Sequence, residues 1–128
     1  MFKPRVLIVE DTIEIADLLG RYARLVGCET RVAATGEEAL RIAREFLPQI
    51  VLLDIGLPGM DGWQVARILR EELLPVHPVL IAVTAFSSPE DVRRSVDAGI
   101  DHHLTKPAFR KPLMELLMHL VGREGSTP

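Results

Sequence analysis

Five polar residues that could do chemistry stand at or just after short apolar runs of this 128-residue chain. Glu10 and Asp11 follow RVLIV, Asp54 ends IVLLD, Thr84 ends VLIAVT, and Lys106 follows HHLT. Carboxylates can act as nucleophiles or cation ligands, while an ammonium group and a hydroxyl can hold an anion such as a phosphoryl group. If the fold gathers all five residues, they would form a cradle for a phosphoryl group.

Three carboxylates around one pocket repel one another, and the pKa of at least one would rise until that group bound a proton. A hard divalent cation removes this repulsion, and Mg²⁺ prefers carboxylate and water oxygens in an octahedral arrangement. We therefore expect Glu10, Asp11 and Asp54 to bind Mg²⁺, with the backbone carbonyl of Gly56 as a further ligand. Lys106 would add a second positive charge opposite the metal.

Asp54 is the candidate nucleophile, because carboxylates form acyl phosphates in covalent phosphoryl transfer. Mg²⁺ and Lys106 would neutralise charge on the transferring oxygens, and the Thr84 hydroxyl would donate to the bound anion. Transfer of this kind depends mostly on positioning and electrostatics, so it requires no histidine base.

The apolar runs predict five strands of one parallel sheet. Residues 5–9, 50–54 and 79–84 are almost continuously apolar, as strands covered on both faces are, whereas 29–34 and 102–105 are weaker and are expected nearer the sheet edges. Segments with a helical spacing of apolar residues separate the runs. Such alternation implies a doubly wound α/β domain with helices on both faces of the sheet. The carboxyl ends of the strands then meet at one edge, where ligands bind.

The helix expected over residues 89–98 has the smallest apolar surface. Its sequence, PEDVRRSVDA, offers only Val92 and Val96 as an apolar stripe, so we expect it to be the least firmly docked helix. Arg93 and Arg94 contribute to a basic face on the same segment. Trp63, just inside an earlier helix, is expected to pack partly rather than to contact a ligand.

Composition limits the classes of function. A formal charge of −3 gives no overall attraction to nucleic acid or to an acidic membrane surface. The start of the chain contains no apolar segment long enough for a signal peptide or a membrane span. Cys28 is the only cysteine, which excludes an internal disulfide and a zinc cluster. We therefore expect a cytoplasmic protein without direct contact to nucleic acid or membrane.

The motifs VLIVEDT, LLDIGLPGMDGW, VTA and LTKP, in this order and spacing, resemble the receiver domain of two-component response regulators. The resemblance runs from Arg5 to Val121. It implies a flavodoxin-like sheet of five parallel strands in the order 2-1-3-4-5, with a receiver domain over residues 1–121 and a short polar tail over 122–128. With nothing left over for an output domain, the chain resembles a stand-alone receiver.

The resemblance implies a phosphorylation-dependent signalling switch and not a turnover enzyme. Glu10 and Asp11 would hold Mg²⁺, and Asp54 would accept a phosphoryl group from a sensor histidine kinase or a histidine phosphotransfer protein. The protein would catalyse its own phosphorylation and the slow loss of the phosphoryl group, as a monomer or a weak dimer. The sequence names neither the cognate kinase nor the downstream target.

Phosphorylation is expected to change the face formed by residues 89–98, residues 102–105 and the last helix, which would bind partner proteins. The resemblance makes Thr84 the switch hydroxyl, pairs Lys106 with the phosphoryl group, and implies a cis peptide bond between Lys106 and Pro107. His103 stands where the family has a moving aromatic ring. Its imidazole either replaces that ring as a flat group or makes the switch work differently.

Two positions beside the expected pocket also bear on its chemistry. Gly56 and Phe86 lie two residues beyond Asp54 and Thr84, where receivers adjust the lifetime of the acyl phosphate. Gly56 cannot orient a water molecule, whereas Phe86 can shield the site.

Two other functions are weighed against the switch. An aspartyl-phosphate hydrolase of the haloacid dehalogenase-like family normally has a second aspartate two residues after the nucleophile, and here that position is Gly56. A degenerate receiver, which binds partners without phosphorylation, would usually have lost pocket residues, and none is missing here. Both alternatives are therefore disfavoured.

Overall fold

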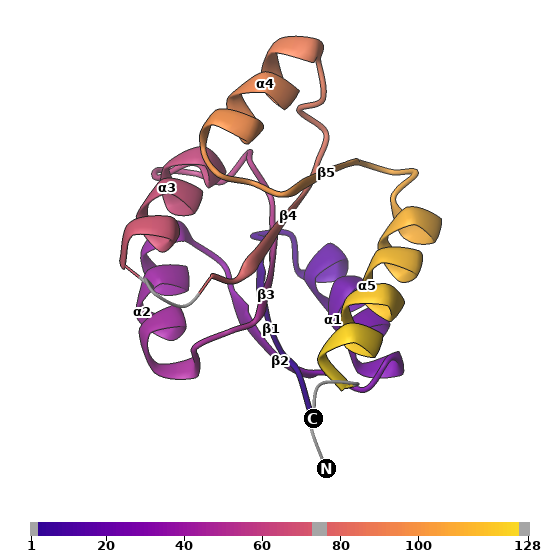
Figure 1. Ribbon diagram of the computed structural model, residues 1–128. Coiled ribbons are helices and arrows are strands. Elements are labelled where there is room, and N and C mark those ends of the chain that lie inside the picture. Colours follow the sequence, from indigo (N-terminus) through magenta and orange to yellow (C-terminus); the bar gives the residue numbers. More distant parts are fainter. Residues whose placement is uncertain (1–2, 73–76, 126–128) are drawn as a thin grey trace.

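The computed structural model describes residues 3–72 and 77–125. Within them, five strands and five helices alternate in the expected order (Figure 1). The elements are β1 (Arg5–Val9), α1 (Ile13–Leu25), β2 (Glu29–Ala33), α2 (Gly36–Phe46), β3 (Ile50–Leu53), α3 (Gly62–Glu72), β4 (Val79–Thr84), α4 (Pro89–Asp97), β5 (His102–Thr105) and α5 (Arg110–Gly125). Neighbouring strands are all parallel, in the order β2-β1-β3-β4-β5. The predicted doubly wound fold is confirmed, and so are the edge positions of β2 and β5.

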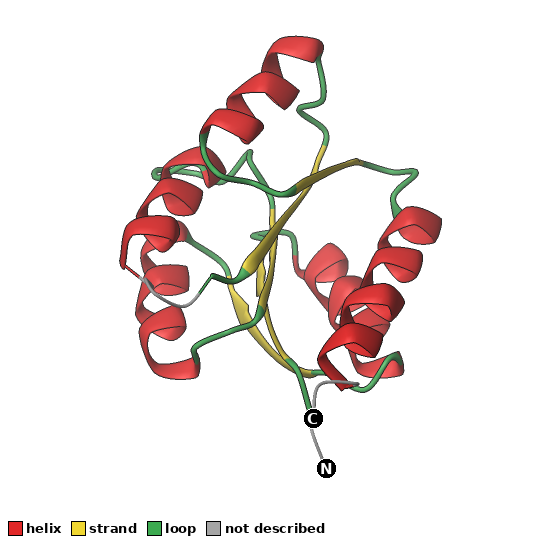
Figure 2. Ribbon diagram, viewed as in Figure 1, coloured by secondary structure: helices red, strands yellow, loops and turns green. Residues whose placement is uncertain are grey.

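Helices cover both faces of the sheet, with α1 and α5 on one face and α2 and α3 on the other (Figure 2). Successive residues of β1 point to opposite faces. Leu7 and Val9 belong to the cluster beneath α2 and α3, while Val6 and Ile8 belong to the cluster beneath α1 and α5. All four side chains are fully buried. Burial on both faces explains why the central strands are apolar at nearly every position.

The last helix is longer than the sequence indicated. α5 begins at Arg110 and continues to Gly125. Residues 122–125 of the expected polar tail are therefore helical, and residues 126–128 lie outside the described part of the chain. No helix within the described ranges is long and apolar enough to cross a lipid bilayer.

α4 is anchored differently from the prediction. Val92 and Val96, the expected apolar stripe, are 37% and 66% exposed. The buried residue of this helix is Ser95, and Ala98 and Ile100 are buried just beyond its end. The prediction of this buried stripe was wrong because it considered only large apolar side chains, whereas a small hydroxyl side chain takes the inward position. That α4 is the least firmly docked helix stays a prediction.

The loop between β3 and α3 brings two backbone segments into close contact. A Cβ atom on Gly62 would lie 2.7 Å from the Cα of Ile55 and closer still to the carbonyl oxygen of Asp54. The Gly62 N–H donates to the Ile55 carbonyl at 3.0 Å. Asp61 caps α3 by accepting a hydrogen bond from the Gln64 N–H at 2.9 Å. Glycine at position 62 therefore lets α3 start directly against the residues that follow β3.

Candidate functional site

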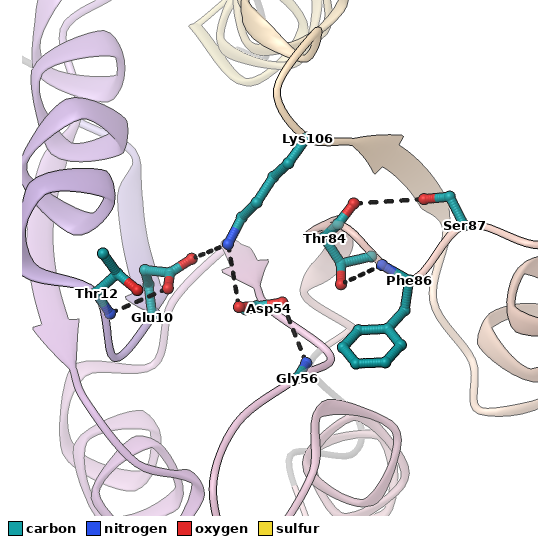
Figure 3. A network of polar contacts seen from close by, with 8 residues as sticks. All are labelled: Glu10, Thr12, Asp54, Gly56, Thr84, Phe86, Ser87 and Lys106. Carbon is teal, nitrogen blue, oxygen red and sulfur yellow. Dashed lines mark hydrogen bonds and ion pairs between the residues drawn. The ribbon is translucent and has the colours of Figure 1, made fainter.

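Polar side chains from four strand ends meet at one edge of the sheet (Figure 3). Glu10 and Asp54 directly follow β1 and β3, Thr84 ends β4, and Lys106 follows β5. The Lys106 ammonium group lies 2.8 Å from Glu10 Oε1 and 3.1 Å from Asp54 Oδ2. The parallel sheet thus gathers groups that are far apart in the sequence, as the strand-end rule requires.

Backbone hydrogen bonds hold both buried carboxylates. The Thr12 N–H donates to Glu10 Oε2 at 3.1 Å, and the Gly56 N–H donates to Asp54 Oδ1 at 3.1 Å. The Asp54 N–H itself donates to the Val9 carbonyl at 2.9 Å, which fixes the start of the loop. Each of the four carboxylate oxygens therefore has a donor, although the two carboxylates share a single ammonium group.

A third carboxylate completes an acidic cluster. One oxygen from each of Glu10, Asp11 and Asp54 lies within 4.8 Å of the other two. Glu10 and Asp54 are buried, whereas Asp11 is exposed, so solvent can reach the cluster on the Asp11 side. Hard oxygen donors with access to water suit Mg²⁺, which keeps several of its waters when it binds a protein. The donor set therefore fits the metal expected from the sequence.

The electrostatic balance of the cluster shows in two pKa shifts. Burial raises the pKa of Glu10 above its ordinary value of 4.5, more than the hydrogen bonds from Lys106 and Thr12 lower it, and the charge of Asp54 adds to the rise. Burial alone would lower the pKa of Lys106, but its hydrogen bonds to Glu10 and Asp54 hold that pKa above 10.5. Lys106 therefore stays protonated, and the cluster has more negative charge than one lysine neutralises.

Glu10→Gln should make the stability of the metal-free protein less dependent on pH. Because the pKa of Glu10 is raised on folding, the folded state binds this proton more tightly than the unfolded chain does. The Glu10 contribution to the free energy of unfolding therefore falls as the pH rises above 4.5. Glutamine resembles the neutral acid and removes this loss.

Urea unfolding in chelator, at several pH values between about 5 and 8, measures the effect. The wild type should lose stability more steeply than Glu10→Gln as the pH rises. Glu14→Gln, on the exposed first turn of α1, serves as the matched control and should follow the wild type. A Glu10→Gln profile parallel to that of the wild type would contradict the assigned shift.

The Phe86 ring lies beside the loop that follows Asp54. The Thr84 hydroxyl is buried and accepts a hydrogen bond from the Phe86 N–H at 3.1 Å. The half-exposed Phe86 ring lies beside Gly56, where an added Cβ atom would be 2.6 Å from Phe86 Cε2 (Figure 3). The ring therefore occupies the space that a side chain at position 56 would need.

His103 lies below α4 and contacts groups that the sequence did not single out together. Its Nδ1 is 2.9 Å from Ser95 Oγ, and its Nε2 is 2.9 Å from the Phe86 carbonyl oxygen. The Trp63 Nε1–H donates to the same Ser95 Oγ at 3.0 Å. Trp63 is buried, more completely than the expected partial packing. The one local signal for Ser95 was its spacing from Ala98, which places two small residues on one face of a helix.

Two further predicted features can be located. The Lys106–Pro107 peptide bond is cis. The Gly56 N–H is directed at Asp54, while its carbonyl group, the expected metal ligand, stays a prediction. The structure thus brings together Glu10, Asp11, Asp54, Thr84 and Lys106 (Figure 3), and it places His103 against Ser95 of α4.

Residues 6–118 match the family model of the response regulator receiver domain, and the chain belongs to this family. Among its relatives is the transcriptional regulatory protein PrrA of Mycobacterium tuberculosis, which is 40% identical over 124 residues. That match covers 97% of this chain and 52% of PrrA, so the chain spans about half the length of this relative.

Solved structures agree with the assignment. A CheY-like receiver domain protein from Methanospirillum hungatei is 28% identical and superposes with a TM-score of 0.85, over 97% of this chain and 98% of that one. The receiver domain of a sensor histidine kinase from Pseudomonas aeruginosa, solved with a magnesium ion in its active-site cleft, is 27% identical with a TM-score of 0.82. That match covers 94% of this chain and 99% of the other. The chain is therefore a receiver domain of a two-component signalling system.

Proposed function

We propose that Asp54 accepts a phosphoryl group from a sensor histidine kinase or a histidine phosphotransfer protein, in the cytoplasm, and that this modification switches the protein between two conformations. The observation that carries the proposal is the contact between the Asp54 carboxylate and the Lys106 ammonium group, beside an acidic cluster. A carboxylate oxygen of Asp54 would attack phosphorus, and the bond between phosphorus and the donor would break. The donor would leave with the electron pair of that bond.

Each neighbouring side chain has a part in this transfer. Lys106 already pairs with Asp54 and would stabilise the phosphoryl oxygens after transfer. Thr84, whose hydroxyl now accepts from the Phe86 N–H, would turn to donate to the phosphoryl group. Glu10, Asp11 and Asp54 would hold Mg²⁺, which when bound neutralises negative charge on the transferring group. The Gly56 carbonyl would be a further ligand.

The family and the face formed by α4, β5 and α5 suggest what kind of partner receives the signal. PrrA is a transcriptional regulatory protein, but the region matched by this chain is about half of it. We propose that the output of this chain passes through the face of α4, β5 and α5 to another protein, without direct contact to nucleic acid or membrane. The chain would act as a monomer or weak dimer and not as a turnover enzyme.

Incubation with acetyl phosphate and Mg²⁺ tests the proposed function. Intact-mass spectrometry should show the addition of one phosphoryl group, and chelation of Mg²⁺ should strongly reduce it, because the acidic cluster would repel the incoming phosphate. Absence of any mass increase at saturating Mg²⁺ would refute the assignment of this edge as a phosphoryl site.

A further inference from the structure

A series of hydrogen bonds, joined through the backbone of Phe86, runs from Thr84 to Trp63 of α3. It begins at the Thr84 hydroxyl, which accepts from the Phe86 N–H. The Phe86 carbonyl oxygen lies 2.9 Å from His103 Nε2, and His103 Nδ1 lies 2.9 Å from Ser95 Oγ. Ser95 Oγ in turn accepts from the Trp63 indole N–H at 3.0 Å. One residue, Phe86, therefore links the expected switch hydroxyl to the His103 ring.

The groups around His103 favour one tautomer of the neutral imidazole. The Phe86 carbonyl oxygen only accepts, so its contact with His103 Nε2 favours a proton on that nitrogen, and Ser87 Oγ, 3.1 Å from the same nitrogen, can accept from it as well. His103 Nδ1 is then an acceptor, and the Ser95 hydroxyl must donate to it. The Trp63 indole only donates, and Ser95 Oγ has the lone pairs to accept. With this tautomer, every contact of His103 pairs a donor with an acceptor.

Ser95 is the residue through which this series of hydrogen bonds contacts α4. It is 1% exposed and is the buried residue of the helix, while Val92 and Val96 face solvent. The neighbouring Arg94 places its guanidinium group 3.8 Å from the centroid of the Trp63 ring. Two successive residues of α4 thus contact Trp63 of α3, one through a hydrogen bond and one through a cation–π contact.

We propose that Ser95 and Trp63 are positioning residues of the switch: they hold His103, so that movement of Thr84 toward a phosphoryl group is passed through Phe86 and His103 to α3 and α4. This inference rests on the proposed function. The resemblance to receivers implies roles for positions 84 and 103, whereas the extension through Ser95 to Trp63 is carried by the contacts of this chain. A polar network anchored at the buried pair Ser95 and Trp63 suits this task, because loss of either bond to Ser95 leaves a buried polar group unpaired and favours a concerted change.

The single tryptophan of the chain makes the proposal measurable, since one indole N–H signal in a proton–nitrogen NMR spectrum belongs to Trp63. Beryllofluoride with Mg²⁺, added as a phosphoryl mimic, should shift the amide signals around Asp54 and also the indole signal. In His103→Phe and Ser95→Ala, the amides around Asp54 should still shift, but the indole response should fall to a small fraction of that of the wild type. His102→Phe, an exposed neighbour on β5, is the matched control and should keep the full response.

The outcomes separate the two proposals. If the amides around Asp54 shift in the wild type and the indole signal does not, the chain of hydrogen bonds does not transmit the event, and the inference is wrong while the proposed function stands. An indole response in His103→Phe and Ser95→Ala equal to that of the wild type would overturn the inference as well. If neither set of signals moves, the proposed function fails, and the inference fails with it. Ser95→Cys keeps nearly the volume of serine but has a weaker hydrogen-bonding group, so its indole response should lie between those of the wild type and Ser95→Ala.

Discussion

Asp54→Asn should abolish labelling by acetyl phosphate, which is the largest effect on activity that we expect. Asparagine keeps the size of the side chain but lacks the carboxylate oxygen that forms the bond to phosphorus. It also removes one negative charge from a cluster in which two buried carboxylates share one ammonium group, so the variant should fold. Circular dichroism verifies the fold, and intact-mass spectrometry measures the label.

The control for this experiment is Asp17→Asn, which makes the same chemical change on the exposed surface of α1. It should be labelled as completely as the wild type. Equal labelling of the Asp54→Asn variant would show that another residue accepts the phosphoryl group, and it would remove the basis for the roles proposed for Lys106 and Thr84.

Gly62→Ala should cause the largest loss of stability. The added methyl group would lie 2.7 Å from the Cα of Ile55 and closer still to the Asp54 carbonyl oxygen, both backbone atoms that no side-chain rotation can move away. Overpacking of this kind costs about 1–3 kcal/mol, and contact with backbone places this site at the upper end of that range. Because Asp54 must shift with its loop, labelling should slow as well.

Gly122→Ala provides a matched comparison for this substitution. A Cβ atom at this exposed position of α5 meets nothing within 4 Å, and alanine favours helix over glycine by at most about 1 kcal/mol. Urea unfolding should therefore show a lower midpoint for Gly62→Ala and an unchanged or higher one for Gly122→Ala. Equal midpoints for the two variants would mean that the loop after β3 adapts far more easily than its geometry indicates.

The order of elements and the edge of the sheet that carries the polar residues could be predicted because both follow from local patterns. Continuous apolar runs mark buried parallel strands, and in such a sheet the strand ends lie together whatever the side chains do. The pairing of Lys106 with Glu10 as well as Asp54 was less predictable, since Lys106 was expected opposite the metal. That detail depends on the path of one long side chain.

The anchoring of α4 could not be predicted from its own sequence. Ser95 is buried because Trp63, 32 positions earlier, and His103, eight positions later, both offer it a hydrogen bond. A serine in a helix is ordinarily solvated or at a cap, so the spacing of apolar residues does not predict that it is buried. The same limit applies to Gly62, whose neighbours are known only once the loop has folded back onto β3.

The contact between the Phe86 ring and Gly56 restricts how these two positions can vary. A Cβ atom on residue 56 and the ring of residue 86 compete for one space, with only 2.6 Å between them. The ring is half exposed and free to swing outward, so a larger residue at position 56 would displace it without disturbing the core. A smaller residue at position 86 would, in the same way, make room for many side chains at position 56. Substitutions at the two positions are therefore coupled, because the size of residue 56 decides where the ring of residue 86 can lie.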